Sequence, residues 1–239
     1  MYQERFYREW TKDTDLYKYW IVIKETDMLV CTSRKLSEEF IKEIVKKYRT
    51  QIEEYVKTYE EFQTSLSPVK IEEDAPPIIE ELGKYSHRLG IGPFAGVAGA
   101  IAQFVGEELM KVSPEVIVEN GGDLFLKLEK IRKVGIVFYE PGRENILRIK
   151  IKPQNTPLGI SSSSSKIGHS LSLGNVDLSC ILARNSILSD MCATLLGNII
   201  KTKKDVPSAF KFIKKIEGVK GALVIVEGEV SVWGDVEFV

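Results

Sequence analysis

The sequence predicts an α+β protein in which antiparallel sheets are layered with paired helices. Strand-like segments follow one another as hairpins, helix-like segments come in pairs, and the two kinds do not alternate singly as they do in βαβ units. The chain has 239 residues, 44% of them hydrophobic, so it is long enough to bury a full core. We therefore expect a single domain over residues 1–239.

A hairpin and a long helix open the chain. Residues 19–24 and 28–33 are rich in apolar and β-branched residues, which predicts two strands joined by a short link. Ser37 is placed to cap a helix, and apolar residues recur at helical spacing from Phe40 to Tyr59, so one face of that helix is expected to be buried. Residues 65–77 contain three prolines and are interpreted as a surface loop rather than a boundary between domains.

Further pairs of elements follow. The pattern predicts helices over residues 78–89 and 94–110, and strands over 116–119 and 123–128. It also predicts strands over 134–139, 146–151 and 176–183, helices over 187–200 and 208–216, and a closing hairpin from 222–226 and 230–233.

Charge and cysteine content exclude several classes of protein. Lys and Arg number 33 against 34 Asp and Glu, so the chain has no basic excess for binding nucleic acid or an anionic membrane surface. The three cysteines are far apart and form neither a disulfide framework nor a zinc motif, and no apolar leader opens the sequence. We expect a cytoplasmic protein with no membrane or nucleic-acid partner, and a homodimer because twofold dimers are the commonest soluble oligomers.

Four stretches carry residues suited to ligand binding. The first, Gly90–Ala100, is rich in glycine and precedes a predicted helix, which is typical of phosphate binding at a helix N-terminus or of close helix packing. Its spacing fits neither a dinucleotide fingerprint nor a P-loop. Close packing is therefore the preferred interpretation of Gly96 and Gly99.

The second stretch is a turn, Asn120–Gly121–Gly122, followed by Asp123. Asn-Gly is a strong hairpin signal because both central residues of such a turn need positive φ. Two glycines also let backbone N–H groups approach a ligand, with Asn120 and Asp123 adding side-chain contacts. A plain turn and a binding turn are about equally supported.

The third and fourth stretches contain hydroxyl and carboxylate groups. Five serines, Ser161–Ser165, precede Gly168 and His169; such a run is usually a linker, but small hydroxyl residues beside glycine also form phosphate-binding nests. Asp190 and Thr194 lie four residues apart on one face of a predicted helix, and their oxygen atoms suit Mg²⁺ or Ca²⁺. The alternative is that Asp190 is a helix N-cap and Thr194 incidental.

Together, and in this order, the four stretches resemble the ApbE flavin-transferase superfamily. The run Gly96–Ala102 resembles its glycine-rich helix start, and Asn120–Asp123 its Gly-Gly-Asp turn. Ser161–Ser165 with Gly168-His169 is similar to its Thr-Ser-Gly segment and following His element, and Asp190-x-x-x-Thr194 to its metal-binding motif. The similarity is closer still to a cytoplasmic branch of uncharacterised proteins related to ApbE, and there it covers nearly the whole chain.

The resemblance implies an ApbE-like, T-fold-like architecture and a Mg²⁺ site that grips the pyrophosphate of FAD. FMN is then transferred to a Thr or Ser hydroxyl of an acceptor protein, or FAD is hydrolysed. On this chain the implied metal ligands are the backbone carbonyl of Ala98 and the side chains of Asp190 and Thr194. The implied catalytic residues are His169 and Asp123. The implied contacts to FAD or FMN are Gly96, Gly99, Asn120, Gly121, Gly122, Asp123, Ser162, Ser163, Ser164, Gly168 and His169.

One departure from the family bears on activity. The transferases usually carry a lysine in the glycine-rich segment where this chain has Gly99, and its loss removes a charge-assisted contact to a pyrophosphate. Three functions therefore stay open. They are a Mg²⁺-dependent FMN transferase or FAD pyrophosphatase, a non-catalytic nucleotide-sensing or partner-binding protein, and a component of sulfur assimilation in homocysteine formation.

Overall fold

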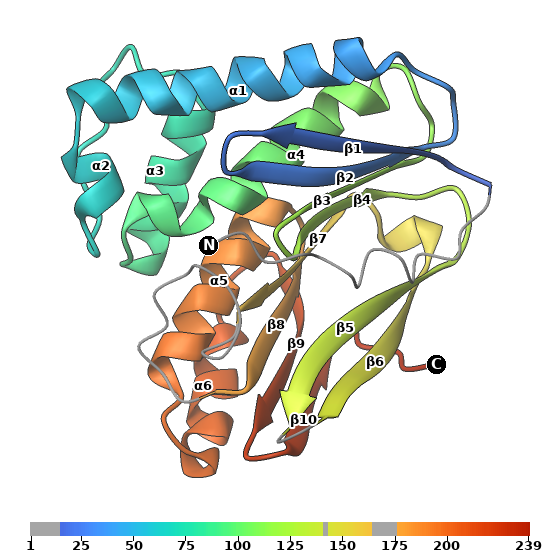
Figure 1. Cartoon of the computed structure of the whole chain (residues 1–239). Coiled ribbons are helices and arrows are strands. Elements are labelled where there is room, and N and C mark those ends of the chain that lie inside the picture. The colour runs from blue at the N-terminus through green and yellow to red at the C-terminus, as the bar shows by residue number, and fades with distance from the viewer. Residues whose placement is uncertain (1–14, 141–142, 164–175) are drawn as a thin grey trace.

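An eight-stranded antiparallel sheet organises the molecule (Figure 1). The structure, a computed structural model, describes residues 15–140, 143–163 and 176–239. The strands of the large sheet follow the order β1-β2-β3-β4-β7-β8-β9-β10, and β5 and β6 form a separate two-stranded sheet. Every strand pair is antiparallel, so the predicted α+β class with antiparallel sheets is confirmed.

The strands match the predicted hairpins with small shifts at their ends. Their bounds are Tyr17–Ile23 (β1), Thr26–Thr32 (β2), Val116–Asn120 (β3), Asp123–Lys127 (β4), Arg132–Glu140 (β5), Arg143–Ile151 (β6), Leu158–Ser163 (β7), Leu178–Ala183 (β8), Val219–Val226 (β9) and Glu229–Gly234 (β10). The sequence pattern does not predict strand β7, because its serine-rich half is typical of a linker or a phosphate-binding nest. It pairs with both β4 and β8, and so occupies the middle of the large sheet.

The helices lie mainly on one face of the large sheet. Their bounds are Glu38–Thr58 (α1), Glu61–Thr64 (α2), Pro77–Leu89 (α3), Val97–Met110 (α4), Ser186–Ile199 (α5) and Val206–Ile213 (α6), and short 3-10 helices include Pro93–Gly96 directly before α4. Among the described residues, no single helix is long and apolar enough to span a membrane. The bent pair Pro77–Leu89 and Pro93–Met110 passes that test only when taken together, across an angle of 113°.

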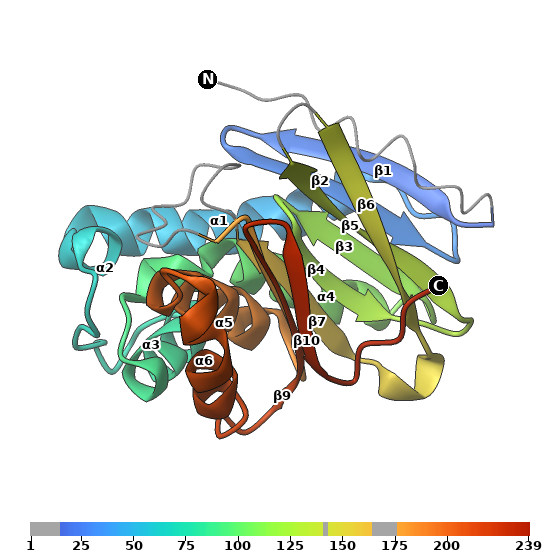
Figure 2. The same ribbon diagram turned by 90° about the horizontal axis from the view of Figure 1, so that it is seen from below.

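The order of elements divides the chain into two similar halves. In the first half, β1 and β2 are followed by α1 to α4 and then by β3 and β4; in the second, β7 and β8 are followed by α5 and α6 and then by β9 and β10. The hairpin β5–β6 is inserted between the halves and crosses the opposite face of the sheet (Figure 2). One hydrophobic core therefore lies between the sheet and the helices, and a second lies between the sheet and this hairpin.

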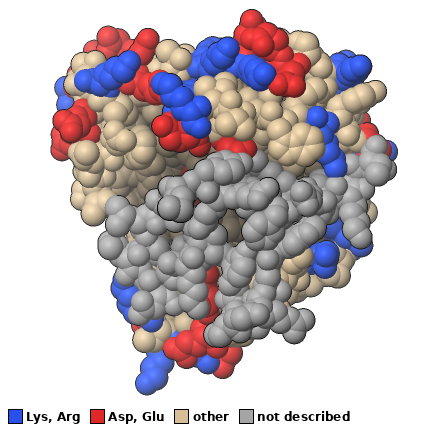
Figure 3. Space-filling model, viewed as in Figure 1, with Lys and Arg blue, Asp and Glu red and all other residues tan. Residues whose placement is uncertain are grey.

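The long first helix forms as predicted. Ser37 is its N-cap, and the Ser37 hydroxyl accepts a hydrogen bond from the Phe40 N–H at 3.1 Å. Its opposite, exposed face carries charges of both signs, among them the Lys42–Glu38 pair at 2.6 Å, and acidic and basic side chains are interspersed along it (Figure 3). The following loop packs onto the helices, since the Val69 carbonyl lies 3.0 Å from the His87 ring.

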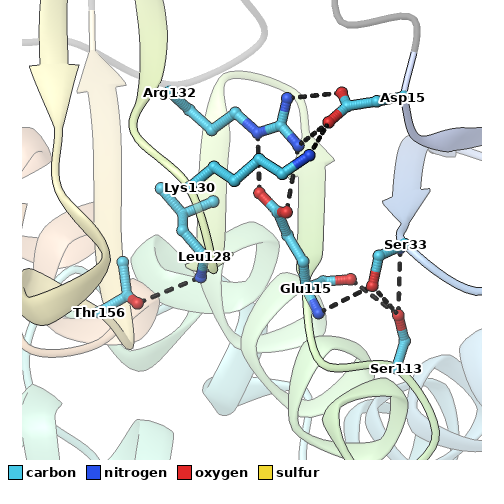
Figure 4. Close-up of polar contacts among 8 residues, drawn as sticks. All are labelled: Asp15, Ser33, Ser113, Glu115, Leu128, Lys130, Arg132 and Thr156. Atoms are coloured by element: carbon cyan, nitrogen blue, oxygen red, sulfur yellow. Dashed lines mark hydrogen bonds and ion pairs between the residues drawn. The ribbon is translucent and has the colours of Figure 1, made fainter.

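A buried ion pair ties three segments of the chain together (Figure 4). Arg132, at the start of β5, donates two hydrogen bonds to the Glu115 carboxylate, at 2.8 and 3.1 Å, and also contacts Asp15 just before β1. Arg132 is 6% exposed and Glu115 2%. The carboxylate is thus enclosed together with the guanidinium that neutralises it, which is the arrangement a buried charge requires.

Replacing Glu115 by glutamine should destabilise the fold strongly. The variant keeps the shape of the side chain but leaves the buried Arg132 charge with less compensation, and breaking a buried pair typically costs about 3–5 kcal/mol. Urea denaturation at neutral pH measures the loss. The matched control is Glu81→Gln, which removes an exposed i,i+3 pair with Lys84 at 3.0 Å and should change stability by less than about 0.5 kcal/mol. Equal losses of unfolding free energy in the two variants would show that the buried pair stabilises the fold no more than the exposed pair does.

Candidate functional site

Helices α4 and α5 pack against each other in antiparallel orientation at the centre of the helical layer. The Asp190 carboxylate of α5 accepts a hydrogen bond from the Gly99 N–H of α4 at 2.8 Å. Three residues earlier on α5, the Ile187 N–H donates to the Gln103 side chain of α4 at 3.3 Å. The first turn of each helix is therefore contacted by a side chain from the other helix, which supplies a partner for N–H groups that lack one inside the helix.

Gly99 allows this close approach because it has no side chain. A Cβ atom at this position would lie 2.4 Å from the Ser186 carbonyl oxygen and 2.8 Å from the Asp190 Cβ. Gly96 serves in the same way, since a Cβ there would lie 2.6 Å from a side-chain carbon of Met191. The predicted close packing of the glycine-rich segment is confirmed, and the same packing leaves no room at residue 99 for a lysine.

Asp190 does not cap its own helix, so that alternative is wrong. Helix α5 begins at Ser186, and its N-cap is Asn185, whose side chain accepts a hydrogen bond from the Leu188 N–H at 2.9 Å. Asp190 lies one turn further along and is 8% exposed. Burial raises the pKa of this carboxyl to about 7, and the Gly99 hydrogen bond opposes that shift. A buried carboxylate in contact with a neutral N–H is one that a cation would stabilise.

The β3–β4 turn lies against the same end of α4. Gly121 and Gly122 both have positive φ, 70° and 99°, so the predicted tight turn is confirmed. The Asn120 side chain donates to the Ala98 carbonyl at 3.0 Å, and the Gly122 N–H donates to the Glu119 carboxylate at 2.8 Å. Glu119 stands within the turn motif, but sequence reasoning gave it no role.

A row of polar residues crosses the sheet beneath the two helices. Asp123 is the register partner of Asn120 on β3 and of Ser161 on β7, so the three side chains share one face of the sheet. Asn120 contacts α4 through Ala98, and the Ser161 hydroxyl lies 2.8 Å from the hydroxyl of Ser189 on α5. The row therefore faces the helices, with the buried Asp123 carboxylate at its middle.

The serine run is divided between the two faces of the sheet. Strand alternation places Ser161 and Ser163 on the helix side and Ser162 on the opposite side, towards the buried thiol of Cys180. Burial raises the pKa of Cys180 to about 12, so this thiol is a core group rather than a nucleophile. Three predicted site residues, Ser164, Gly168 and His169, lie outside the described residues.

Three groups on α4 and α5 carry oxygen atoms of the kind that a hard cation binds. They are the Ala98 carbonyl, the Asp190 carboxylate and the hydroxyl of Thr194, a half-buried residue one helical turn beyond Asp190. Within the described part of the chain, no three or more His, Cys, Asp and Glu side chains gather as a metal centre. A site with one carboxylate fits Mg²⁺, which commonly keeps several waters and uses one or two carboxylates together with phosphate oxygens of a ligand.

Fold and site together define an α+β protein whose polar site lies between two antiparallel helices and one face of an antiparallel sheet. The family model described as "AbpE bacteria" matches residues 8–232, and the chain belongs to this family. A UPF0280 protein of Methanosarcina acetivorans is 32% identical over 216 residues, which span 90% of this chain and 85% of that protein. A UPF0280 protein of Methanocaldococcus jannaschii is 30% identical over 228 residues, 92% of this chain and 91% of that protein.

Solved structures share the fold at low sequence identity. The crystal structure of the apo flavinyl transferase ApbE of Pseudomonas stutzeri gives a TM-score of 0.57 at 11% identity and covers 92% of this chain and 94% of that chain. The ApbE protein of Thermotoga maritima gives a TM-score of 0.61 at 12% identity, over 92% of this chain and 96% of that chain. At such identities the similarity establishes a common fold, which agrees with the architecture that the resemblance implied.

Replacing Gly99 by alanine should separate the two helices. The added Cβ overlaps the Ser186 carbonyl, and overpacking of this kind typically costs about 1–3 kcal/mol even though alanine favours a helix. We expect a lower melting temperature and faster hydrogen exchange at the amide of residue 99. The control is Gly135→Ala on β5, where a Cβ would have its nearest neighbour at an ordinary 3.5 Å. A Gly99→Ala protein as stable as the control would contradict the close approach described above.

Proposed function

We propose that the site binds a flavin or adenine nucleotide, FAD or FMN, together with Mg²⁺, and that the protein acts on FAD as a flavin transferase or pyrophosphatase. The observation that supports this most is the buried Asp190 carboxylate, which accepts a hydrogen bond from the Gly99 N–H in the same peptide unit as the Ala98 carbonyl. These groups come from opposite halves of the chain and meet beside the Asn120–Asp123 turn. Membership of the family and the fold shared with flavin transferases support the same proposal.

The residues divide into two sets in this proposal. Ala98, Asp190 and Thr194 hold the metal, which when bound neutralises charge on phosphate oxygens and on a leaving group. Asn120, the glycines of the turn and Ser163, on the helix side of β7, hold the nucleotide. Gly168 and Ser164 belong to the same nucleotide-binding set. Asp123 and His169 act at the reacting group, where a Ser or Thr hydroxyl of the acceptor protein, or water, would give up its proton and attack the FMN phosphorus of FAD, and AMP would leave as the pyrophosphate bond breaks.

A non-catalytic nucleotide-sensing protein is the second candidate, and one observation favours it. The space at Gly99 is filled by Ser186 and Asp190, so residue 99 supplies no cationic side chain to a pyrophosphate. Incubation with FAD and Mg²⁺, with and without a Ser- or Thr-containing acceptor protein, separates the candidates. Release of AMP supports the enzyme, whereas tight FAD binding without AMP supports the sensor.

Replacing Asp190 by asparagine tests the metal site directly. The amide oxygen still accepts the Gly99 hydrogen bond, so the fold should persist, but the negative charge that holds Mg²⁺ is lost. We expect the Mg²⁺-dependent part of FAD binding, measured by flavin fluorescence, to disappear. Thr194→Val should weaken it less, because a neutral hydroxyl contributes less to a hard cation than a carboxylate does.

The matched control is Asp74→Asn, which removes an exposed carboxylate from the loop before α3. It should bind FAD and Mg²⁺ like the parent. If Asp190→Asn also binds like the parent, Asp190 serves only as a cross-helix cap, a role worth about 1 kcal/mol of stability.

A further inference from the structure

Hydrogen bonds of buried serine hydroxyls connect helix α5 to the large sheet. The Ser186 hydroxyl donates to the Leu124 carbonyl of β4 at 2.9 Å, and the Ser189 hydroxyl lies 2.8 Å from that of Ser161 on β7. On β8, the Ser179 hydroxyl donates to the Ala193 carbonyl of α5 at 2.8 Å. We refer to Ser161, Ser179, Ser186 and Ser189 as the serine seam; each of the four is 0% exposed.

The serine seam fixes the position of α5 along its own axis. Its contacts on the helix fall at residues 186, 189 and 193, which share one helical face, and they reach three neighbouring strands in turn. Burial of apolar surface is not directional, so it holds a helix against a sheet without defining its axial register. Hydrogen bonds are directional, and a shift of a single residue would move the helix by about 1.5 Å and break them.

Asp190 directly follows the central contact of the seam. Its carboxylate must lie within hydrogen-bond reach of Gly99 while Ser189 lies against Ser161, because consecutive residues of a helix move together. Ser161 is the member of the polar row that β7 contributes, and its hydroxyl contacts that of Ser189 on α5, the helix that carries the Asp190 carboxylate. We propose that this pair is a positioning device that sets the Asp190 carboxylate opposite the Ala98–Gly99 backbone and so determines the metal affinity of the site. The proposal rests on the proposed function, since it assumes that Asp190 binds a metal.

The positioning role is tested on the full chain with Mn²⁺ as the only added ligand, and electron paramagnetic resonance measures its binding. Loss of a group that orients a metal ligand typically lowers metal affinity about 10–100-fold. Ser161→Ala and Ser189→Ala should each weaken Mn²⁺ binding by about 10-fold or more. The double variant should be little worse than either single one, because the two hydroxyls act as one unit. In metal-free protein, the Gly99 amide should exchange faster in all three variants.

The control is Ser113→Ala. It removes a hydroxyl that is 1% exposed and donates to the Glu115 carbonyl at 2.8 Å, beyond the far end of α4. It should lower the melting temperature as the seam variants do, yet leave Mn²⁺ affinity and Gly99 exchange unchanged. Unchanged Mn²⁺ affinity and Gly99 exchange in folded Ser161→Ala and Ser189→Ala would overturn the positioning role. If the parent protein itself binds no Mn²⁺, the proposed metal site is wrong. Hydrogen exchange at the Gly99 amide then still decides whether the Ser161–Ser189 pair positions Asp190.

Discussion

The hydrogen bond between the Gly99 N–H and the Asp190 carboxylate joins the two halves of the chain at the centre of the fold. Much of the surrounding structure is arranged around it. Residue 99 must be glycine for α5 to come so close, and the Asn120 side chain fixes the neighbouring Ala98 carbonyl. Burial of the ionised Asp190 carboxylate is unfavourable, as its raised pKa indicates. A cation bound beside the carboxylate would offset this unfavourable free energy.

The repeated order of strands and helices explains why the site lies there. Each half contributes two hairpins with helices between them, and the halves meet where β4 pairs with β7. Helices α4 and α5 consequently lie over the central strands, and the first turn of each contacts a side chain of the other. A ligand bound between them would contact both halves, as the polar row of Asn120, Asp123 and Ser161 already does.

Local chemistry made part of the structure predictable. The Ser37 cap, the apolar spacing of α1 and the Asn-Gly-Gly turn each depend on a few neighbouring residues, and each appears as expected. The glycine-rich segment packs closely, as its own residues indicate, although the sequence does not reveal its partner; the contact of Gly96 and Gly99 with FAD that the resemblance implies stays a prediction. Family motifs indicated which residues to consider as a site, and the structure brings Ala98, Gly99, Asn120, Asp123 and Asp190 into one region.

The errors arose where a residue's role depends on distant segments. Five serines in a row resemble a linker, yet Ser161 lies in a central strand because small hydroxyl groups fit beneath α5. Asp190 resembled an N-cap because the sequence does not show that Asn185 caps α5 or that Asp190 reaches Gly99 on another helix. Ser162 and Ser163 likewise lie on opposite faces of the large sheet because they are consecutive residues of β7, a strand that the local sequence pattern does not predict.

Anomalous diffraction from crystals soaked in Mn²⁺ tests the central claim most directly. The account predicts a single strong peak about 2 Å from the Ala98 carbonyl oxygen and an Asp190 carboxylate oxygen, with the Thr194 hydroxyl next to it. A peak at another place in the molecule, or none beside Asp190 at saturating Mn²⁺, would contradict it. In that case the carboxylate would be a cap that joins two helices, and the polar region around it would have no metal-binding role.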